Sequence, residues 1–162
     1  MNAPDGELER DAEFLRYRRS RFRTRLPTAA RYTRSHYWLM PDGEGCWRVG
    51  WTRFATRMLG ELVELGFEVE PGQSIKVGDT IGWIEGFKAV SEIYAVANGT
   101  FLGANPAFAE GVEGLASSPH DRGWLYRVEG EPEPESVDVS GYAAILNATI
   151  DRMLDEQNGP SG

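Results

Sequence analysis

The stretch "VGDTIGWIEGFKAVSEIYAVANG", residues 77–99, decides the fold. Two runs of strand-forming residues, 80–87 and 89–96, lie on either side of a single lysine, Lys88, and glycine-containing turn signals bound both runs. This pattern predicts a β-hairpin with Lys88 at or next to its turn. The apolar residues of the two arms would anchor the hairpin while the lysine amine stays in water.

Lysine is rare in this chain, which has only Lys76 and Lys88 against fifteen arginines. An exposed lysine in a turn is usually just a solvated charge, but its scarcity here favours a need for an amine at position 88. Rigid support beneath an exposed amine is typical of a modification site. It is not typical of a Schiff-base lysine, because such a lysine needs a desolvating pocket that lowers its pKa.

Short runs of β-branched and aromatic residues, separated by Gly, Asp and Pro, fill the chain from His36 to about residue 130. Their spacing predicts a mainly β fold, a small antiparallel sandwich or barrel with peripheral helices. Thr52 and Asn105 are expected to cap two short helices. We divide the chain into an Arg-rich helical extension (1–35), a β domain (36–130), and an acidic linker with a C-terminal helix (131–162).

Apolar residues recur at spacings of seven, seven and four in the Arg-rich extension, which predicts a helix that ends at Pro27. These residues are Leu8, Leu15, Phe22 and Leu26. Nine arginines against five acids give residues 1–35 a charge of +4, whereas residues 36–162 carry −12. The extension can pack on its own domain, dock a partner through its basic groups, or stay disordered. We expect the segment 1–35 to be dispensable for folding and needed, if at all, for partners.

The C-terminal segment has the strongest helical periodicity of the chain and should pack its apolar face onto the sheet. That face comprises Tyr142, Ile145, Leu146, Thr149, Ile150, Met153 and Leu154.

Composition excludes several classes of protein. No apolar run approaches the roughly 18 residues of a membrane span, and the first residues lack the apolar core of a secretory signal, so we expect a cytoplasmic protein. Cys46 is the only cysteine, and His36 and His120 are the only histidines, so we predict neither a disulfide nor a metal site. The net charge of −8 disfavours nucleic acid as a partner.

Five separated blocks of the chain resemble, in order and spacing, the glycine cleavage system H-protein family. They are "HYW" (36–38), "VGWTRFATRMLGEL" (49–62), the opening stretch (77–99), "NPAF" (105–108) and "SSPHDRGWLYRV" (117–128). Lys88 falls on the lipoyl-lysine of that family. Glu85 matches the acidic residue that lipoate-attaching enzymes favour, and Gly72 and Gly99 match glycines that flank the lipoyl hairpin. Related biotin carriers set the lysine between methionines, whereas here Phe87 and Ala89 flank it.

The resemblance implies a lipoyl-domain-like flattened β-sandwich with lipoate amide-linked to Lys88. The protein would then be a carrier component of a multienzyme system, with no catalytic residues of its own. The resemblance implies a lipoate-attaching enzyme as a partner. It implies no binding to nucleic acid or to a membrane.

The chain departs from the usual H-protein pattern at Gly86 and Phe87, where the family usually has Ser-Val. It also departs around the Pro of the later loop, where the family usually has an Asn and a Tyr and this chain has Ser117, Ser118, Pro119 and His120. With the C-terminal segment, these features look more like the H-like lipoate-binding proteins of bacterial sulfur oxidation. We therefore predict a carrier of a sulfur-bound intermediate that works with a heterodisulfide-reductase-like complex and sulfur transferases. The alternative is a glycine cleavage carrier of the aminomethyl group, with glycine decarboxylase, aminomethyltransferase and dihydrolipoamide dehydrogenase as partners.

Two other classes of function are considered. A non-lipoylated β-sandwich binding module would leave Lys88 merely exposed. An enzyme is disfavoured because the sequence shows no Ser/His/Asp or Cys/His set, phosphate-binding glycine loop or metal motif. His120 and Asp121 adjoin, but without a nucleophile they are expected to be surface residues.

Overall fold

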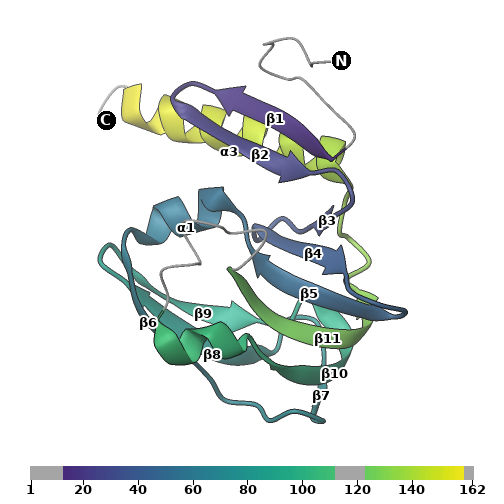
Figure 1. Cartoon of the computed structure of the whole chain (residues 1–162). Helices are drawn as coiled ribbons and strands as arrows, with labels where there is room; N and C mark the ends of the chain where they lie inside the picture. Colours follow the sequence, from purple (N-terminus) through teal and green to yellow (C-terminus); the bar gives the residue numbers. More distant parts are fainter. Residues whose placement is uncertain (1–12, 112–122, 159–162) are drawn as a thin grey trace.

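The computed structural model describes residues 13–111 and 123–158, and it confirms the predicted mainly β fold with a C-terminal helix (Figure 1). A six-stranded sheet has the order β3-β4-β5-β11-β10-β7. Its strands are β3 (Arg31–Tyr32), β4 (Tyr37–Pro41), β5 (Cys46–Trp51), β7 (Ser74–Ile75), β10 (Ala97–Ala104) and β11 (Trp124–Pro132). All pairs in this sheet are antiparallel, as expected for strands joined by short turns.

A three-stranded sheet forms the second layer, and it contains the predicted hairpin. Its strands are β6 (Leu62–Phe67), β8 (Thr80–Gly86) and β9 (Val90–Tyr94), in the order β6-β8-β9. The main hydrophobic core joins the two sheets, with Ile81, Ile84 and Ile93 from the small sheet against Val49 and Tyr126 from the large one. Ile81 and Ile84 of β8 are both buried although they are three residues apart, because the pairing of β8 with β9 shifts register between Thr80 and Gly82, whereas Glu85 is exposed.

Within residues 13–111 and 123–158, the helical segments around the sandwich are α1 (Arg53–Leu59), the 3₁₀ helix η1 (Pro106–Glu110) and α3 (Val139–Asn158). Asn105 caps η1 as predicted, because its side chain accepts a hydrogen bond from the Ala107 N–H at 3.0 Å. Thr52 occupies the N-cap position of α1 but makes no side-chain capping bond. None of the helices in the described part of the chain is long and apolar enough to cross a membrane.

The predicted helix in the Arg-rich extension is wrong over residues 14–27, which form an antiparallel hairpin of β1 (Phe14–Arg19) and β2 (Phe22–Pro27). The sequence alternates with period two there: arginines at 16, 18, 23 and 25 are exposed, while Leu15, Tyr17, Phe22 and Leu26 are buried. The apolar spacing of seven and four that suggested a helix arises by chance, because two alternating strands are joined by a two-residue turn. Ser20 of this turn has a positive φ of 55°. Leu8 lies outside the described residues.

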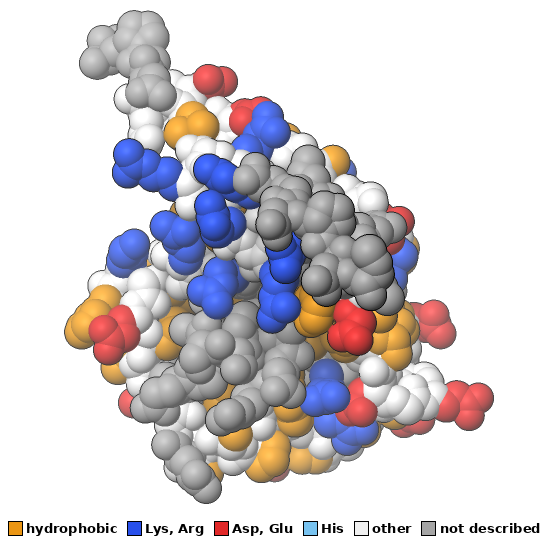
Figure 2. Space-filling view, turned by 45° about the horizontal axis from the view of Figure 1, so that its top comes forward, with side chains coloured by type: hydrophobic (Ala, Val, Ile, Leu, Met, Phe, Trp, Pro, Cys, Tyr) orange, Lys and Arg blue, Asp and Glu red, His pale blue; other side chains and the backbone are white. Residues whose placement is uncertain are grey.

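Arginine side chains thus share the outer face of this hairpin, and Lys and Arg gather on that side of the molecule (Figure 2). Arg16 is paired in register with Arg25, and Arg18 with Arg23. Like charges directly opposite each other on a two-stranded ribbon are unfavourable. The hairpin must therefore be stabilised by the packing of its buried inner face.

The inner face packs on α3, so the extension and the C-terminal helix form a second core together. Tyr32 stacks on Tyr142 with ring centroids 4.7 Å apart, and the Tyr17 hydroxyl donates to Asn147 Oδ1 at 2.8 Å. The apolar face of α3 was expected on the sheet. It packs on the β1–β2 hairpin and at the edge strand β3, and its second core also includes Trp38 of the large sheet (Figure 1).

This second core brings together residues from both ends of the described chain. The six-stranded sheet uses residues from Arg31 to Pro132, slightly beyond the predicted 36–130 range. The segments 13–27 and 139–158, predicted as separate additions at the two ends, pack against each other. The division of the chain into 1–35, 36–130 and 131–162 stays a prediction.

Candidate functional site

Lys88 lies at the turn of the β8–β9 hairpin, in the segment 87–89 that joins the two strands. The Lys88 N–H donates to the Leu59 carbonyl at 2.9 Å, and the Phe87 N–H donates to the Glu61 carbonyl at 2.9 Å. Within the turn, the Gly86 N–H donates to the Ala89 carbonyl at 2.9 Å. The turn is therefore fixed by its backbone to the end of α1, while the Lys88 side chain is exposed.

The exposed tip is unusually apolar on either side of the lysine. The side chain of Phe87 is 77% exposed and that of Val90 is 72% exposed. Exposed large hydrophobic residues beside a fixed amine are a surface that another protein can recognise.

Gly60 makes room for the lysine stem, a role that no local sequence pattern indicates, because Gly60 and Lys88 are far apart in the sequence. It has a positive φ of 78°, and a Cβ there would lie 2.8 Å from the Lys88 Cγ. Gly86 is similarly confined, since its Cβ would collide with the Leu59 carbonyl oxygen. The departure from the usual family pattern at Gly86 therefore has a packing reason in this structure.

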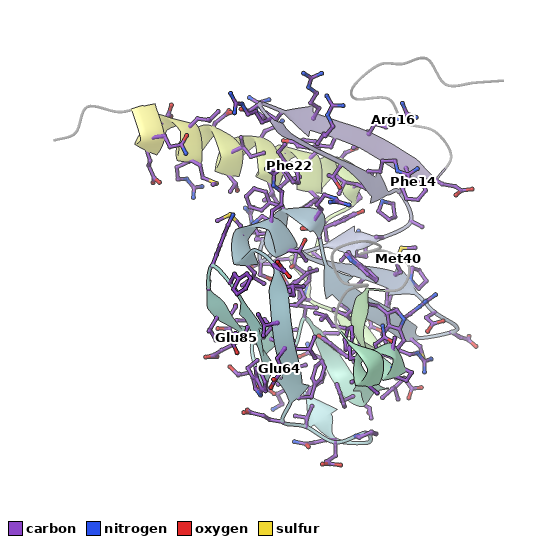
Figure 3. All side chains as sticks on the ribbon, turned by 60° about the vertical axis from the view of Figure 1, so that its left-hand side comes forward. Phe14, Arg16, Phe22, Met40, Glu64 and Glu85 are labelled. Atoms are coloured by element: carbon purple, nitrogen blue, oxygen red, sulfur yellow. The ribbon has the colours of Figure 1, made fainter. Side chains whose placement is uncertain are left out.

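Glu85, the predicted recognition residue, is exposed on β8, three residues before Lys88. It is in register with Glu64 of β6, and the two carboxylates lie side by side on the outside of the small sheet (Figure 3). Two like charges opposite each other do not stabilise a sheet. The position of Glu85 thus has no evident structural benefit.

The two other predicted site residues, Gly72 and Gly99, lie elsewhere in the sandwich, at positions where the backbone conformation or a close strand contact requires glycine. Gly72 has a positive φ of 95° in the turn before β7, and its N–H donates to the Phe101 carbonyl at 2.8 Å. Gly99 lies in β10, where a Cβ would collide with the Glu129 backbone of β11. The structure gives both glycines a folding role and no contact with Lys88.

Lys76, the second lysine, is also exposed, in the turn between β7 and β8. Its N–H donates to Asp79 Oδ2 at 2.9 Å, and the Asp79 N–H donates to the Lys76 carbonyl at 2.9 Å. Exposure does not distinguish the two lysines. They differ in that only Lys88 lies at a hairpin tip docked on a helix.

His36 lies beside α1 in a hydrogen-bonded cluster. Its Nδ1 is 2.8 Å from the Tyr142 hydroxyl, which is 2.7 Å from Thr52 Oγ1. Its ring is also 4.7 Å from the ring of Phe54. Burial lowers the pKa of His36 from 6.5 to about 4, so the imidazole is neutral at physiological pH. The cluster ties α3 to the start of α1 and so supports the platform on which the hairpin tip rests.

A hollow of about 220 Å³ lies between α1 and β9, near the docked tip. Glu92 and Tyr94 of β9 line one side, Met58 and Leu59 of α1 line another, and His36 also contributes to it. It combines an apolar wall with a carboxylate, which can accept a hydrogen bond from a small cationic group.

The later loop singled out by the sequence, Ser117 to His120, lies outside the described residues, as does Asp121. Cys46 is a half-buried free cysteine in β5.

Comparison with known proteins gives a consistent result. The family model of the glycine cleavage H-protein matches residues 30–146. A glycine cleavage system H protein of Paraburkholderia phymatum is 36% identical over 125 residues, covering 75% of this chain and 97% of that protein. One from Beutenbergia cavernae is 36% identical over 122 residues, with the same coverages.

A solved structure agrees as well. The crystal structure of a glycine cleavage system H protein from Mycobacterium marinum matches with a TM-score of 0.67 and 31% identity, covering 75% of this chain and 99% of that one. The two-layered sandwich with its docked hairpin defines a domain of the lipoyl type. The chain belongs to the glycine cleavage H-protein family, which confirms the predicted resemblance and agrees with a carrier component instead of an enzyme.

The predicted link to sulfur oxidation is not supported. The relatives described above are glycine cleavage system H proteins, and two of the features that suggested the link, Ser118 and His120, lie outside the described residues. Gly86 follows from close packing on α1. The C-terminal helix continues beyond the family match to pack on the β1–β2 hairpin.

Proposed function

We propose that this protein is a lipoyl carrier of a glycine cleavage system, with lipoate amide-linked to Nζ of Lys88. The observation that carries the proposal is the hairpin tip: Lys88 is exposed, yet its backbone is hydrogen-bonded to the end of α1. A carrier needs this combination, because the modifying enzyme must reach the amine and the partners must find the arm in a defined place.

The residues around Lys88 fit such a group. The missing Cβ of Gly60 leaves space for the lysine stem, and the exposed Phe87 and Val90 offer an apolar surface for the attaching enzyme. Lipoate, once bound, supplies a dithiolane that opens reversibly to a dithiol and can carry a small group. The protein supplies the position of the amine, the rigidity of the turn and the recognition surface. Glu85 is the proposed recognition residue for the lipoate-attaching enzyme.

The hollow between α1 and β9 supports an amine as the cargo. Its Glu92 carboxylate and the neutral His36 ring are hydrogen-bonding groups suited to a cationic aminomethyl amine. The proposed partners are therefore glycine decarboxylase, aminomethyltransferase and dihydrolipoamide dehydrogenase. A cytoplasmic location remains a prediction from the sequence.

The attachment site is tested by intact-mass measurement after treatment with a lipoate-attaching enzyme. We expect one lipoyl group on the parent protein and on Lys76→Arg, and none on Lys88→Arg, because a guanidinium group is not acylated. Lys88→Arg keeps the charge and should unfold like the parent. Lipoyl mass on Lys88→Arg would contradict the assignment and point to Lys76.

The pathway is tested in a reconstituted glycine decarboxylase exchange assay with this protein as the only lipoyl carrier. We expect turnover comparable with that of a known H protein, and none with Lys88→Arg. A fully lipoylated protein without turnover would contradict the glycine cleavage role and leave the carrier role intact.

A further inference from the structure

The outer face of the β1–β2 hairpin concentrates positive charge. Residues 14–27 contain six arginines and no acidic residue. Four of these arginines are exposed on the same side of the ribbon, and we call this surface the arginine face: Arg16, Arg18, Arg23 and Arg25. Figure 3 shows Arg16 on the side of the hairpin that is turned away from the sandwich.

The arginine face is an addition to the family fold. The family match covers residues 30–146 and so begins after the hairpin has ended. Lys88 and its hydrogen-bonding partners Leu59 and Glu61 all lie inside the match. Presentation of the lysine therefore does not require the arginine face.

The stability of the hairpin does not account for these arginines either. Like charges at in-register positions of a ribbon are unfavourable, and both cross-strand pairs of the arginine face are Arg–Arg pairs. Among the residues that the structure describes, no carboxylate forms an ion pair with Arg16, Arg23 or Arg25. Arg19, on the inner face, does have such a partner, since it pairs with Asp151 of α3 at 2.8 Å. A local cost that folding does not compensate is typical of a functional surface.

The arginine face is fixed well enough to recognise a shape. The inner face of the same ribbon is anchored to α3 through the bond from Tyr17 to Asn147 and the bidentate pair of Arg19 with Asp151. The guanidinium carbon of Arg25 lies 4.6 Å from the centroid of the Phe14 ring. A guanidinium stacked on a ring still presents its N–H groups in its own plane, where they can bind a carboxylate in a bidentate manner.

The spacing of the arginine face suits the carboxylates of an acidic helix. Side chains on one face of a strand are about 6.8 Å apart, and in-register side chains on the paired strand are about 5 Å away. Acidic residues three or four positions apart on a helix are separated by about 5–6 Å, which falls between these two spacings. A long polyanion or an anionic bilayer fits less well, because it would also meet the −12 charge of residues 36–162.

We propose that the arginine face docks an acidic helix of a partner protein through guanidinium–carboxylate pairs. This contact needs no lipoyl group, so it goes beyond the proposed function. Its consequence for a carrier does rest on that function: a partner held by the hairpin stays close to the protein while the arm on Lys88 is released and bound again, at a raised effective concentration.

The experiment measures, by fluorescence anisotropy, how the full-length protein binds a helical peptide of about 20 residues with glutamates four positions apart on one face. One comparison peptide has glutamine in place of glutamate, and another has the same glutamates spread around the helix. The protein variant combines Arg16→Gln with Arg23→Gln, which removes one arginine from each cross-strand pair and so relieves repulsion in the hairpin. The matched control combines Arg34→Gln with Arg152→Gln, because both residues are exposed and neither lies on the arginine face.

The parent should bind the one-faced glutamate peptide equally well with and without lipoate. Loss of Arg16 and Arg23 should weaken this binding about ten-fold or more, and the control change less than about two-fold, because only the first removes charge-assisted hydrogen bonds. The peptide with spread glutamates should bind at least about three-fold more weakly, since fewer carboxylates face the arginines at once. The glutamine peptide should not bind, and added salt should weaken the binding of the glutamate peptides.

Equal losses in the two protein variants, or equal binding of the two glutamate peptides, would overturn the proposal, because general charge would then explain the binding. Tighter binding, through the same two arginines, of a DNA duplex of about 20 base pairs or of vesicles with about one third phosphatidylglycerol would assign the arginine face to nucleic acid or to a membrane instead. Self-association that disappears without Arg16 and Arg23 would assign it to a second copy of this chain. None of these results alters the lipoylation of Lys88, which the intact-mass measurement tests separately.

Discussion

A Cβ atom on Gly60 would lie 2.8 Å from Cγ of Lys88 and 3.3 Å from the Lys88 backbone nitrogen. The residue that ends α1 and the residue proposed to carry the arm are thus in direct contact, although they are far apart in the sequence. The hydrogen bond from the Lys88 N–H to the Leu59 carbonyl joins the same two segments. The position of the amine consequently depends on how α1 ends.

Gly60→Ala should slow lipoyl attachment at least several-fold, because its methyl group displaces the lysine stem and loosens the docked turn. Gly43→Ala is the control: Gly43 also has a positive φ, 92°, but a Cβ there meets nothing within 4 Å. Both changes should lower the free energy of unfolding by about 1–3 kcal/mol through backbone strain. Mass measurements over time would show slow attachment only for Gly60→Ala; equal rates for both variants would contradict the coupling.

Glu85→Ala should slow modification of Lys88 while leaving the free energy of unfolding unchanged or slightly increased. Its in-register neighbour Glu64 repels it, and removing either charge relieves that repulsion by about 0.2–1 kcal/mol. Glu64→Ala is the matched variant. Chemical denaturation should give the same stability for both, and attachment kinetics should differ. If Glu64→Ala is modified as slowly as Glu85→Ala, general surface charge and not Glu85 guides the enzyme.

Acid should destabilise the protein through His36. Its pKa is about 4 in the folded protein and 6.5 in the unfolded chain, so only the unfolded chain takes up this proton between those values. The contribution of a neutral His36 is fully present above about pH 6.5 and is lost as the pH falls toward 4, by roughly 3 kcal/mol.

The variant His36→Asn isolates this contribution, since Asn tolerates the positive φ of 73° and does not titrate. Denaturation at pH 7 and pH 4.5 should show a smaller loss of stability on acidification in the variant than in the parent. Both proteins share all carboxylates, so the difference reports the histidine. Identical losses would mean that His36 is already accessible to protons in the folded state.

The sequence predicted the hairpin around Lys88 well because that signal is local. The strand-forming residues and the turn glycines occur within about twenty positions. The same holds for Asn105 and for the helix of α3. Strand β6 was not identified, since "LVELGF" follows a helix directly and its strand character depends on pairing with β8. No local pattern contains that information.

The site was predictable only in part, for the same reason. Lys88 and Glu85 are recognisable from their sequence neighbourhood. The fit of Gly60 against Lys88, and the closeness of Arg21 to the end of α3, are tertiary relationships between distant segments. In the extension, arginines at alternate positions masked the strand pattern, because Arg is also a good helix former and the hydrophobic residues happened to match helical spacing.

The extension should prove necessary for stability, contrary to the expectation that the segment 1–35 is dispensable for folding. Leu26 is fully buried in the second core, among the residues that pack on α3. Leu26→Ala should therefore lower the free energy of unfolding by about 2–5 kcal/mol through lost burial and a residual cavity. Arg23→Ala, on the outer face opposite Arg18, should have no effect beyond about 0.5 kcal/mol, or a small gain from relieved repulsion.

Urea denaturation of both variants and of a protein lacking residues 1–29 would decide the matter. The truncated protein loses all of β1 and β2 and uncovers Phe54, Tyr142 and Leu146, so it should be less stable than Leu26→Ala. If the sandwich folds independently, Lys88 of the truncated protein would still accept lipoate. The turn that carries Lys88 is hydrogen-bonded to Leu59 and Glu61, and these bonds do not involve the β1–β2 hairpin. Parent-like stability of both Leu26→Ala and the truncated protein would restore the original expectation and assign the extension to partner binding alone.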